Sequence, residues 1–263
     1  MTYPIQYDMK GQSCFMSGAT SGINEQIARR FAEAGANIFV ISRSPEKVQR
    51  TVDMLKEAGG EASGSPVDVR DYDSVVSAVT RAQATFGNFD VVFAGQAGNF
   101  PAGAAQMSAN AFKSVIDIDL LGTFNVFRAT IEHAKKPGAS YLAISAPQAT
   151  RPWLFQSHVC AAKAGVNMLI KCCALEWGAS GVRVNAISPG PIDGTEGMER
   201  LAPTEELKAK VADAVAMKRM GNRDDIAEAA LWLCSPAASY VTGTVLEAEG
   251  GMTLGDATNA MKL

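Results

Sequence analysis

A glycine-rich turn near the amino end holds the first residues that could do chemistry. Residues 17–24 read Ser-Gly-Ala-Thr-Ser-Gly-Ile-Asn; they follow a short apolar run and open a helical pattern. Glycines let the backbone approach a phosphate, and a helix amino terminus supplies N–H donors and a favourable dipole. A plain tight turn is the alternative, but the strand–turn–helix context favours a dinucleotide phosphate site. The candidate residues are Gly18, Thr20, Ser21, Gly22 and Ile23.

The residues after the second predicted strand indicate which dinucleotide would bind. An acidic residue there would bond the adenosine ribose hydroxyls of NAD. This chain has Ser42, Arg43 and Ser44, with no carboxylate before Glu46. A guanidinium flanked by hydroxyls suits a 2′-phosphate. The expected cofactor is therefore NADPH/NADP, the alternative being that Arg43 is a solvated surface charge.

A second set of chemically capable side chains lies in residues 157–165, which open an amphipathic helix. Lys163 brings a positive charge, whereas Val159, four residues earlier, has no proton to give. His158 could serve as an acid, because an unperturbed histidine has a pKa of about 6.5. A histidine at a helix start is more often a capping or surface residue, so both interpretations stay open.

Composition limits the possible partners and compartment. Of the 263 residues 47% are hydrophobic and 19% charged, which is ordinary for a globular protein, and the net charge of −3 does not favour nucleic acid. The five cysteines show no metal-ligand pairing, so we expect no metal and reduced thiols. No run of 18 apolar residues exists, so no membrane span is expected.

The ends of the chain suggest a location. Residues 1–10 lack the layout of a signal peptide, and the cytoplasm is the expected location. In a eukaryote the peroxisome would be expected instead. Residues 261–263 (Met-Lys-Leu) are faintly similar to a peroxisomal address, but Met261 stands where a small residue is usual.

Apolar runs alternate with helical patterns along the whole chain. The predicted strands are 14–16, 37–42, 62–67, 90–94, 140–145, 182–187 and 244–248. The predicted helices are 23–34, 45–58, 71–86, 109–133, 156–179, 205–216 and 224–233. This alternation predicts an α/β fold: a single-domain, Rossmann-like, doubly wound parallel sheet of about seven strands with helices on both faces. Residues 1–263 would form one domain, with a dinucleotide-binding part at about 10–150 and a substrate loop at about 188–215. The long irregular stretches, 96–106 and 188–204, would border the ligand.

These motifs together resemble the short-chain dehydrogenase/reductase superfamily over nearly the whole chain. The resemblance is carried by the glycine turn, Asp68, residues 94–98, Lys163 and residues 183–190. It implies that Lys163 binds the nicotinamide ribose. The other cofactor contacts that it implies are Asp68, Val69, Ala94, Gly95, Pro189, Gly190, Ile192 and Thr195. Asn24 stands where the family has a third glycine and puts a side chain where helix and strand pack closely.

The chain departs from the superfamily at the proton donor. Ordinary members use a serine, a tyrosine and a lysine, but the tyrosine position is Val159 and the serine position is Ala146, next to Ser145. Losing a positioned acid typically removes ~10²–10⁴ of rate. Ketone reduction by the usual route is therefore not expected.

Within the superfamily, residues 97–100, His158 and residues 189–197 resemble the 2,4-dienoyl-CoA reductases, and residues 238–243 agree with their peroxisomal type. That resemblance implies an NADPH-dependent enoyl-thioester reductase in which Asp119 and Lys163 form the catalytic pair. It also implies an acyl-CoA-type substrate and a homotetramer. Apolar faces for such an assembly are offered by Leu120, Phe124 and Phe127 and by Leu169, Ile170 and Cys173, which would equally fit packing on the sheet. The expected substrate contacts are Asn99, Phe100, Ser145, His158 and Met198, with Leu201 in the acyl channel and Arg151 and Arg200 as candidates for the CoA phosphates. Two alternatives remain: a reductase of another activated alkene or carbonyl, and a non-catalytic NADP-binding homologue.

Overall fold

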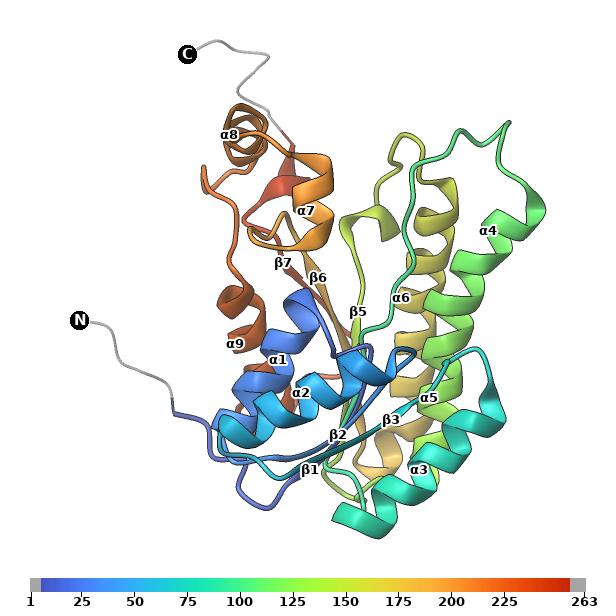
Figure 1. Cartoon of the computed structure of the whole chain (residues 1–263), viewed down its shortest axis with the longest axis vertical. Helices are drawn as coiled ribbons and strands as arrows, with labels where there is room; N and C mark the ends of the chain where they lie inside the picture. The colour runs from blue at the N-terminus through green and yellow to red at the C-terminus, as the bar shows by residue number, and fades with distance from the viewer. Residues whose placement is uncertain (1–5, 256–263) are drawn as a thin grey trace.

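Seven parallel strands form one sheet through the centre of the molecule (Figure 1). The computed structural model describes residues 6–255. The strand order is β3-β2-β1-β4-β5-β6-β7, and every neighbouring pair runs parallel. The strands are β1 (Ser13–Ser17), β2 (Asn37–Ser42), β3 (Ala62–Pro66), β4 (Val91–Ala94), β5 (Ser140–Ile144), β6 (Arg183–Pro189) and β7 (Val245–Ala248). The expected doubly wound parallel sheet is confirmed, with each strand within two residues of its predicted bounds.

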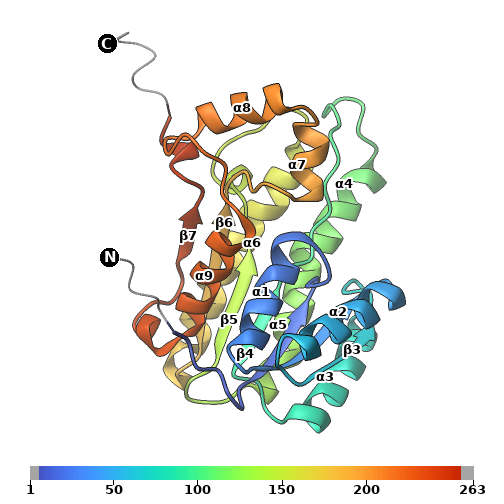
Figure 2. The same cartoon turned by 60° about the vertical axis from the view of Figure 1, so that its left-hand side comes forward.

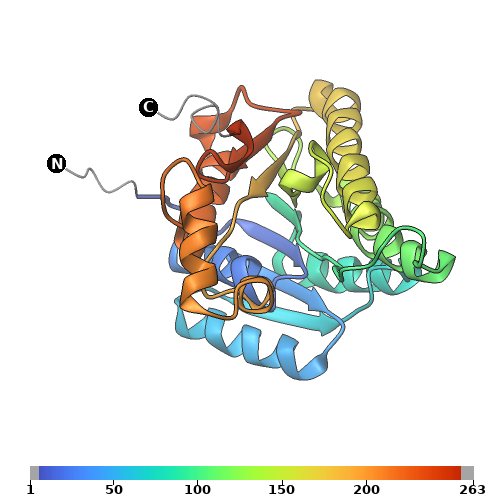
Figure 3. The ribbon, with the colours of Figure 1, turned by 90° about the horizontal axis from the view of Figure 1, so that it is seen from above.

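Helices cover both faces of the sheet, as the views from the side and from above show (Figures 2 and 3). One face packs against α1 (Gly22–Glu33), α2 (Pro45–Glu57) and α9 (Arg223–Cys234). The opposite face packs against α3 (Tyr72–Phe86), α5 (Gly122–Thr130) and α6 (Ser157–Trp177). Except for α5, which was expected as part of a longer helix, these helices lie within two residues of the sequence expectation. Apolar periodicity and, in α2, α3 and α9, side-chain N-caps mark their bounds.

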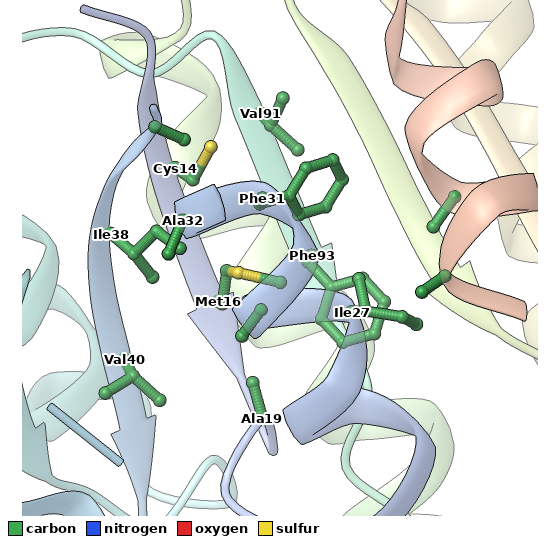
Figure 4. Packing of buried hydrophobic residues seen from close by; sticks show 14 of the residues in the cluster. Cys14, Met16, Ala19, Ile27, Phe31, Ala32, Ile38, Val40, Val91 and Phe93 are labelled. Carbon is green, nitrogen blue, oxygen red and sulfur yellow. The ribbon is translucent and has the colours of Figure 1, made fainter. Parts of the chain in front are cut away.

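Side-chain alternation along the central strands builds the two halves of the core. On β1, Cys14 and Met16 join the cluster under α1, which Figure 4 shows around Ile27 and Phe31. Phe15 points to the other face, where its ring lies 5.5 Å from that of Phe89. Because successive strand residues point to opposite faces, a continuous apolar run is what a strand covered on both sides requires.

The expected single helix over 109–133 is continuous but changes its winding. It consists of α4 (Ala109–Val115), the π-helix η1 (Ile116–Leu121), α5, and the 3₁₀ turn η2 (Ile131–His133). A π-turn shifts the side chains that follow it around the helix, and such turns are frequent at functional sites. Periodicity alone could not locate this shift, which falls at the segment that carries Asp119.

The stretch expected to be irregular at 188–204 contains a helix, so that expectation was wrong. Helix α7 (Glu196–Leu201) forms there, followed by α8 (Glu205–Ala214). Thr195 is the N-cap of α7 and accepts from the Met198 backbone N–H at 3.4 Å. The short remaining turns are η3 (Pro147–Ala149), η4 (Gly178–Ser180), η5 (Pro236–Ala238) and η6 (Met252–Leu254). In Figure 1, α7 and α8 lie above the carboxyl ends of β6 and β7.

Helix α6 together with η4 is long and apolar enough by length and composition to cross a membrane, although a core helix passes the same test. Here its buried side, including Val166 and Ile170, belongs to the core cluster on the sheet. No group of three or more metal-ligating side chains occurs between residues 6 and 255. Residues 261–263, considered above as an address, lie outside the described residues.

The apolar faces expected at 120–127 and 169–173 mostly pack inside the molecule. Ile170, Cys173 and Phe127 are buried against the sheet. Leu120 and Leu169 are partly buried against the same cluster, whereas Phe124 is 41% exposed. All of the residues predicted for oligomer contact except Phe124 therefore pack inside the monomer. Other exposed apolar side chains nearby are Leu121, Met168 and Leu175.

Candidate active site

The ligand crevice of a doubly wound sheet lies where the strand order reverses, here between β1 and β4. The turn after β1 and the segment after β4 touch at this point. Gly18 has a φ of +68°, and a Cβ on it would lie 2.4 Å from the Gln96 backbone nitrogen. Both the backbone conformation and the close approach therefore require glycine at position 18.

Asn24 joins the same two segments. Its Nδ2 donates to the carbonyl oxygen of Gly95 at 2.6 Å and to that of Gly18 at 3.2 Å. The side chain does lie in the close contact that the sequence predicted, but as a hydrogen-bonding bridge between the segments rather than as an obstruction. Sequence patterns gave no signal for this bridge, since it depends on where β4 ends.

A cavity of about 510 Å³ extends over the crevice. The predicted cofactor residues that line it are Gly18, Thr20, Ser21, Ser42, Arg43, Asp68, Val69 and Gly95. Ile23 instead packs against the core, and Ala94 is buried within the sheet. The lining also includes Lys47, which the sequence analysis missed, because an exposed lysine in the first turn of α2 carries no signal of its own.

The lining chemistry fits an anionic dinucleotide. The first N–H groups of α1 have no partner within the helix, and its N-cap Ser21 makes no side-chain cap bond. Arg43 and Lys47 add two cations at the end of the cavity beyond β2. A glycine cradle, unpaired N–H donors and positive charge together form a phosphate-binding surface.

Asp68, at the carboxyl end of β3, is held by an arginine. Arg70 donates to it from Nε at 3.0 Å, and this hydrogen bond is the main reason that the pKa of the Asp68 carboxyl is lowered. The ionised carboxylate and the neighbouring Val69 line the cavity wall where the resemblance expected them.

Lys163 and Asp119 form a buried pair. Lys163 Nζ lies 3.2 Å from Asp119 Oδ2, and the two side chains are 5% and 0% exposed. Nζ also donates to the Ile144 carbonyl at 2.9 Å, and Asp119 Oδ1 accepts from the Gly98 backbone N–H at 2.6 Å. The π-helix η1 and helix α6 thus bring together two residues that lie 44 positions apart, 163 minus 119.

Within residues 6–255, the positions of the superfamily's usual tyrosine and serine provide no free hydroxyl group. Val159 is 4% exposed and packs with Val115 and Ala162. Ser145 is buried, and its hydroxyl donates to Asn167 Oδ1. Ser145 therefore has its hydrogen committed within the protein.

His158 is not the capping or surface residue that its position at a helix start suggested. It is 0% exposed, and its ring lies 4.4 Å from the Phe100 ring. Neither ring nitrogen has a hydrogen-bond partner among residues 6–255. Phe100 belongs to the segment after β4 and is half-buried, whereas Asn99 is exposed. The burial follows from this loop folding over the first turn of α6, which no helical pattern reveals.

The cofactor residues predicted in the segment after β6 do not line the first cavity. A Cβ on Gly190 would lie 2.7 Å from Glu249 Cα, so the segment from Pro189 packs tightly against the turn after β7. Ile192 is buried and lines a second cavity, and Thr195 donates to the Ile192 carbonyl. Their side chains therefore face the protein rather than the first cavity.

Of the residues expected around the acyl channel and the CoA phosphates, one is buried and the others lie on the surface. Met198 is 8% exposed, but Leu201 is 65% exposed on the outer side of α7. Arg200 forms a surface ion pair with Glu196. Arg151 is exposed and lies six residues before the first residue of α6.

Comparison with known proteins gives the class. Residues 18–253 match the family model described as enoyl-(acyl carrier protein) reductase. The chain belongs to the short-chain dehydrogenase/reductase superfamily, whose members are oxidoreductases that use a nicotinamide cofactor. A solved short-chain dehydrogenase/reductase of Mycobacterium ulcerans shares this fold with a TM-score of 0.89 and 28% identity, over 97% of this chain and 94% of that one.

Two curated relatives show the range of related activities. The peroxisomal 2,4-dienoyl-CoA reductase of Saccharomyces cerevisiae, which produces (3E)-enoyl-CoA, is 40% identical over 247 residues, 92% of this chain and 84% of that protein. The 3beta-hydroxysteroid dehydrogenase 1 of Eggerthella lenta is 36% identical over 251 residues, 94% of this chain and 95% of that protein.

Proposed function

We propose that this protein is an NADPH-dependent reductase of conjugated enoyl thioesters, with 2,4-dienoyl-CoA as substrate. Two observations carry the proposal: Lys163 and Asp119 form a buried pair, and Val159 stands at the position where the superfamily usually has a tyrosine acid. The 40% identity to a dienoyl-CoA reductase supports the same substrate class.

The reaction suits a site without a tyrosine. When bound, NADPH supplies a hydride to C5, the far carbon of the dienoyl group. The electron pair moves through the conjugated system to the thioester oxygen, which then carries the negative charge of a dienolate. A proton added at C2 leaves a C3–C4 double bond, so dienoyl-CoA, NADPH and one proton become 3-enoyl-CoA and NADP. The protein must stabilise the oxygen and provide a route for the proton, and it need not protonate an alkoxide.

Lys163 is proposed to bind the nicotinamide ribose and to supply positive potential to the dienolate. Its ammonium is held by the Ile144 carbonyl and by Asp119, so its position is fixed before any ligand arrives. Preorganised charge in a buried site stabilises developing charge more strongly than a mobile surface charge.

Asp119 is proposed to orient a water molecule, or to relay a proton, toward the substrate carbon. Its Oδ1 is fixed by the Gly98 backbone N–H, which leaves Oδ2 to face the ammonium. A carboxylate that only neutralises Lys163 would have the same geometry, so variants must separate the two roles.

NADPH rather than NADH is proposed because the end of the cavity beyond β2 carries cations. Arg43 and Lys47 line it, and Ser42 and Ser44 add hydroxyl groups. A 2′-phosphate would accept charge-assisted hydrogen bonds from these groups.

The substrate is proposed to lie along the loop after β4. Asn99 would donate its amide to the thioester carbonyl, and Phe100 would wall the acyl slot, with Met198 beyond it under α7. A homotetramer, and a peroxisomal location in a eukaryotic cell, are proposed from the same resemblance, since the yeast relative is named as peroxisomal.

The test follows NADPH absorbance on addition of 2,4-hexadienoyl-CoA. NADH is the alternative cofactor, and a 3-ketosteroid is the alternative substrate. We expect rapid NADPH oxidation with the dienoyl thioester, slow reaction with NADH, and none with the ketone. Turnover of the ketone instead would favour the steroid-type activity of the Eggerthella relative. Lack of NADPH binding by calorimetry would indicate a non-catalytic homologue.

A further inference from the structure

His158 is a buried polar side chain that the mechanism above does not use. Its ring is fully buried, yet neither nitrogen is hydrogen-bonded within residues 6–255. Buried polar groups in native proteins are paired in the large majority of cases, and leaving one unpaired is costly. The nitrogens of this ring are therefore available to a group outside the described residues, such as a bound ligand.

The position of the ring indicates which ligand. His158 lies on α6 five residues before Lys163, and its ring lies 4.4 Å from that of Phe100, with the two planes tilted by 38°. Two residues before Phe100, the Gly98 backbone N–H is bonded to Asp119. One short loop thus contacts both His158 and the carboxylate of the buried pair, which puts the imidazole at the substrate side of the site.

We infer that a ring N–H of His158 is donated to the thioester oxygen of the bound acyl-CoA, stabilising the negative charge that develops there. The inference rests on the proposed function and adds a catalytic residue to it. An imidazole has at least one N–H in either protonation state, so the role does not depend on its charge. Phe100, whose ring lies against that of His158, packs on the apolar cluster of Val115, Val159 and Ala162. An apolar surrounding strengthens a hydrogen bond made there.

Phe100 covers the His158 ring, so the inferred contact requires the Phe100 side chain to move. The residue is half-buried and lies between β4 and α4, in a segment without regular structure. The thioester carbonyl would take the place of the Phe100 ring against the imidazole, and the displaced ring would form the wall of the acyl slot.

The first experiment compares kcat of His158→Leu and His158→Gln with wild type on 2,4-hexadienoyl-CoA. Leucine removes the donor, and we expect kcat to fall by about 10²–10³, the usual effect of losing one oxyanion donor. Glutamine keeps an N–H near the same place and should restore most of the activity. NADPH affinity should be unchanged in both, and His133→Leu, at the end of η2, is the matched control. A folded His158→Leu variant with wild-type kcat would overturn the inference.

The second experiment does not need turnover or a folded variant. The chain has two histidines, so the imidazole nitrogens of ¹⁵N-histidine-labelled wild type give two sets of signals, with His133 as internal reference. Adding saturated hexanoyl-CoA with NADP should shift the His158 signals alone. No shift with acyl-CoA bound contradicts the inference. Failure of the proposed function is seen separately, because wild type would then not oxidise NADPH with the dienoyl thioester.

Discussion

The proposed chemistry of the site depends on one carboxylate and one ammonium that are both buried. Lys163 and Asp119 lie 3.2 Å apart, and each has one further hydrogen bond to the backbone. A buried pair of this kind is weak support for stability, because desolvation offsets much of the attraction, but removing one partner leaves a charge uncompensated. Its presence beside Val159 is therefore more informative about function than about folding.

Asp119→Asn should lower both activity and stability. We expect kcat on dienoyl-CoA to fall by about 10²–10⁴ if the carboxylate acts in proton transfer. The free energy of unfolding should fall by up to about 3–5 kcal/mol, because the Lys163 ammonium loses its counter-charge. Steady-state kinetics and urea unfolding measure the two effects.

The matched control is Asp117→Asn on the same π-helix, which removes only a surface ion pair with Lys113. That variant should change stability by less than about 1 kcal/mol and leave kcat unaltered. If Asp119→Asn folds and turns over normally, Asp119 has no relay role and merely neutralises Lys163.

Arg43→Ala should weaken NADPH binding selectively. Charge-assisted hydrogen bonds contribute about 1.5–3 kcal/mol, so the Kd for NADPH should rise roughly 10- to 100-fold while that for NADH barely changes. Calorimetry with both cofactors measures this, and Arg29→Ala, a surface arginine paired with Glu33 on α1, is the control. Equal losses for both cofactors would mean that Arg43 does not contact a 2′-phosphate.

At the scale of elements, the site depends on where strands end and how the following segments touch. The turn after β1 and the segment after β4 are held together by Gly18, whose close approach excludes a side chain, and by the Asn24 bridge. The π-turn in η1 places Asp119 beneath the loop that carries Gly98. Neither arrangement follows from helical or strand periodicity.

Asn24→Ala should make the glycine-rich turn after β1 less ordered. Two hydrogen bonds to backbone carbonyls would be lost, at about 0.5–1.5 kcal/mol each, and the Kd for NADPH should rise because the turn is less ordered. Urea unfolding and calorimetry provide the readouts, with the exposed Asn110→Ala as the control. An Asn24→Ala protein as stable and as tightly binding as wild type would show that the bridge has no role.

At the scale of the whole molecule, a core layer lies on each face of the sheet. Burial in these layers determines how readily each cysteine thiol of the protein ionises and reacts. Cys14 is fully buried under α1, and burial raises the pKa of its thiol well above the ordinary value. Burial likewise raises the pKa of Cys173 to about 12, whereas its neighbour Cys172 is exposed.

The thiols should therefore react at very different rates with iodoacetamide near neutral pH. The thiolate is the reactive form, so Cys172 should be alkylated at least about 10² times faster than Cys14 or Cys173 in the native protein. Peptide mass spectrometry after timed quenching measures the rates, and all five cysteines should react once the protein is unfolded. Rapid native labelling of Cys14 would contradict the packing of α1 on the sheet.

The sequence alone determined the class of fold and most element bounds, because apolar periodicity and capping residues are local properties of the chain. It also determined the glycine turn, the position of Arg43 after β2 and the absence of a tyrosine before Lys163, since these are fixed by residue type and spacing. The π-turn, the Asn24 bridge, the helix at Glu196–Leu201 and the inward direction of Ile192 and Thr195 were decided only by the tertiary structure. The burial of His158 was also decided only there, and the pairing of Asp119 with Lys163 was expected from the resemblance alone. Both require α6, η1 and the loop after β4 to meet, and contacts between distant segments leave no periodic trace in the sequence.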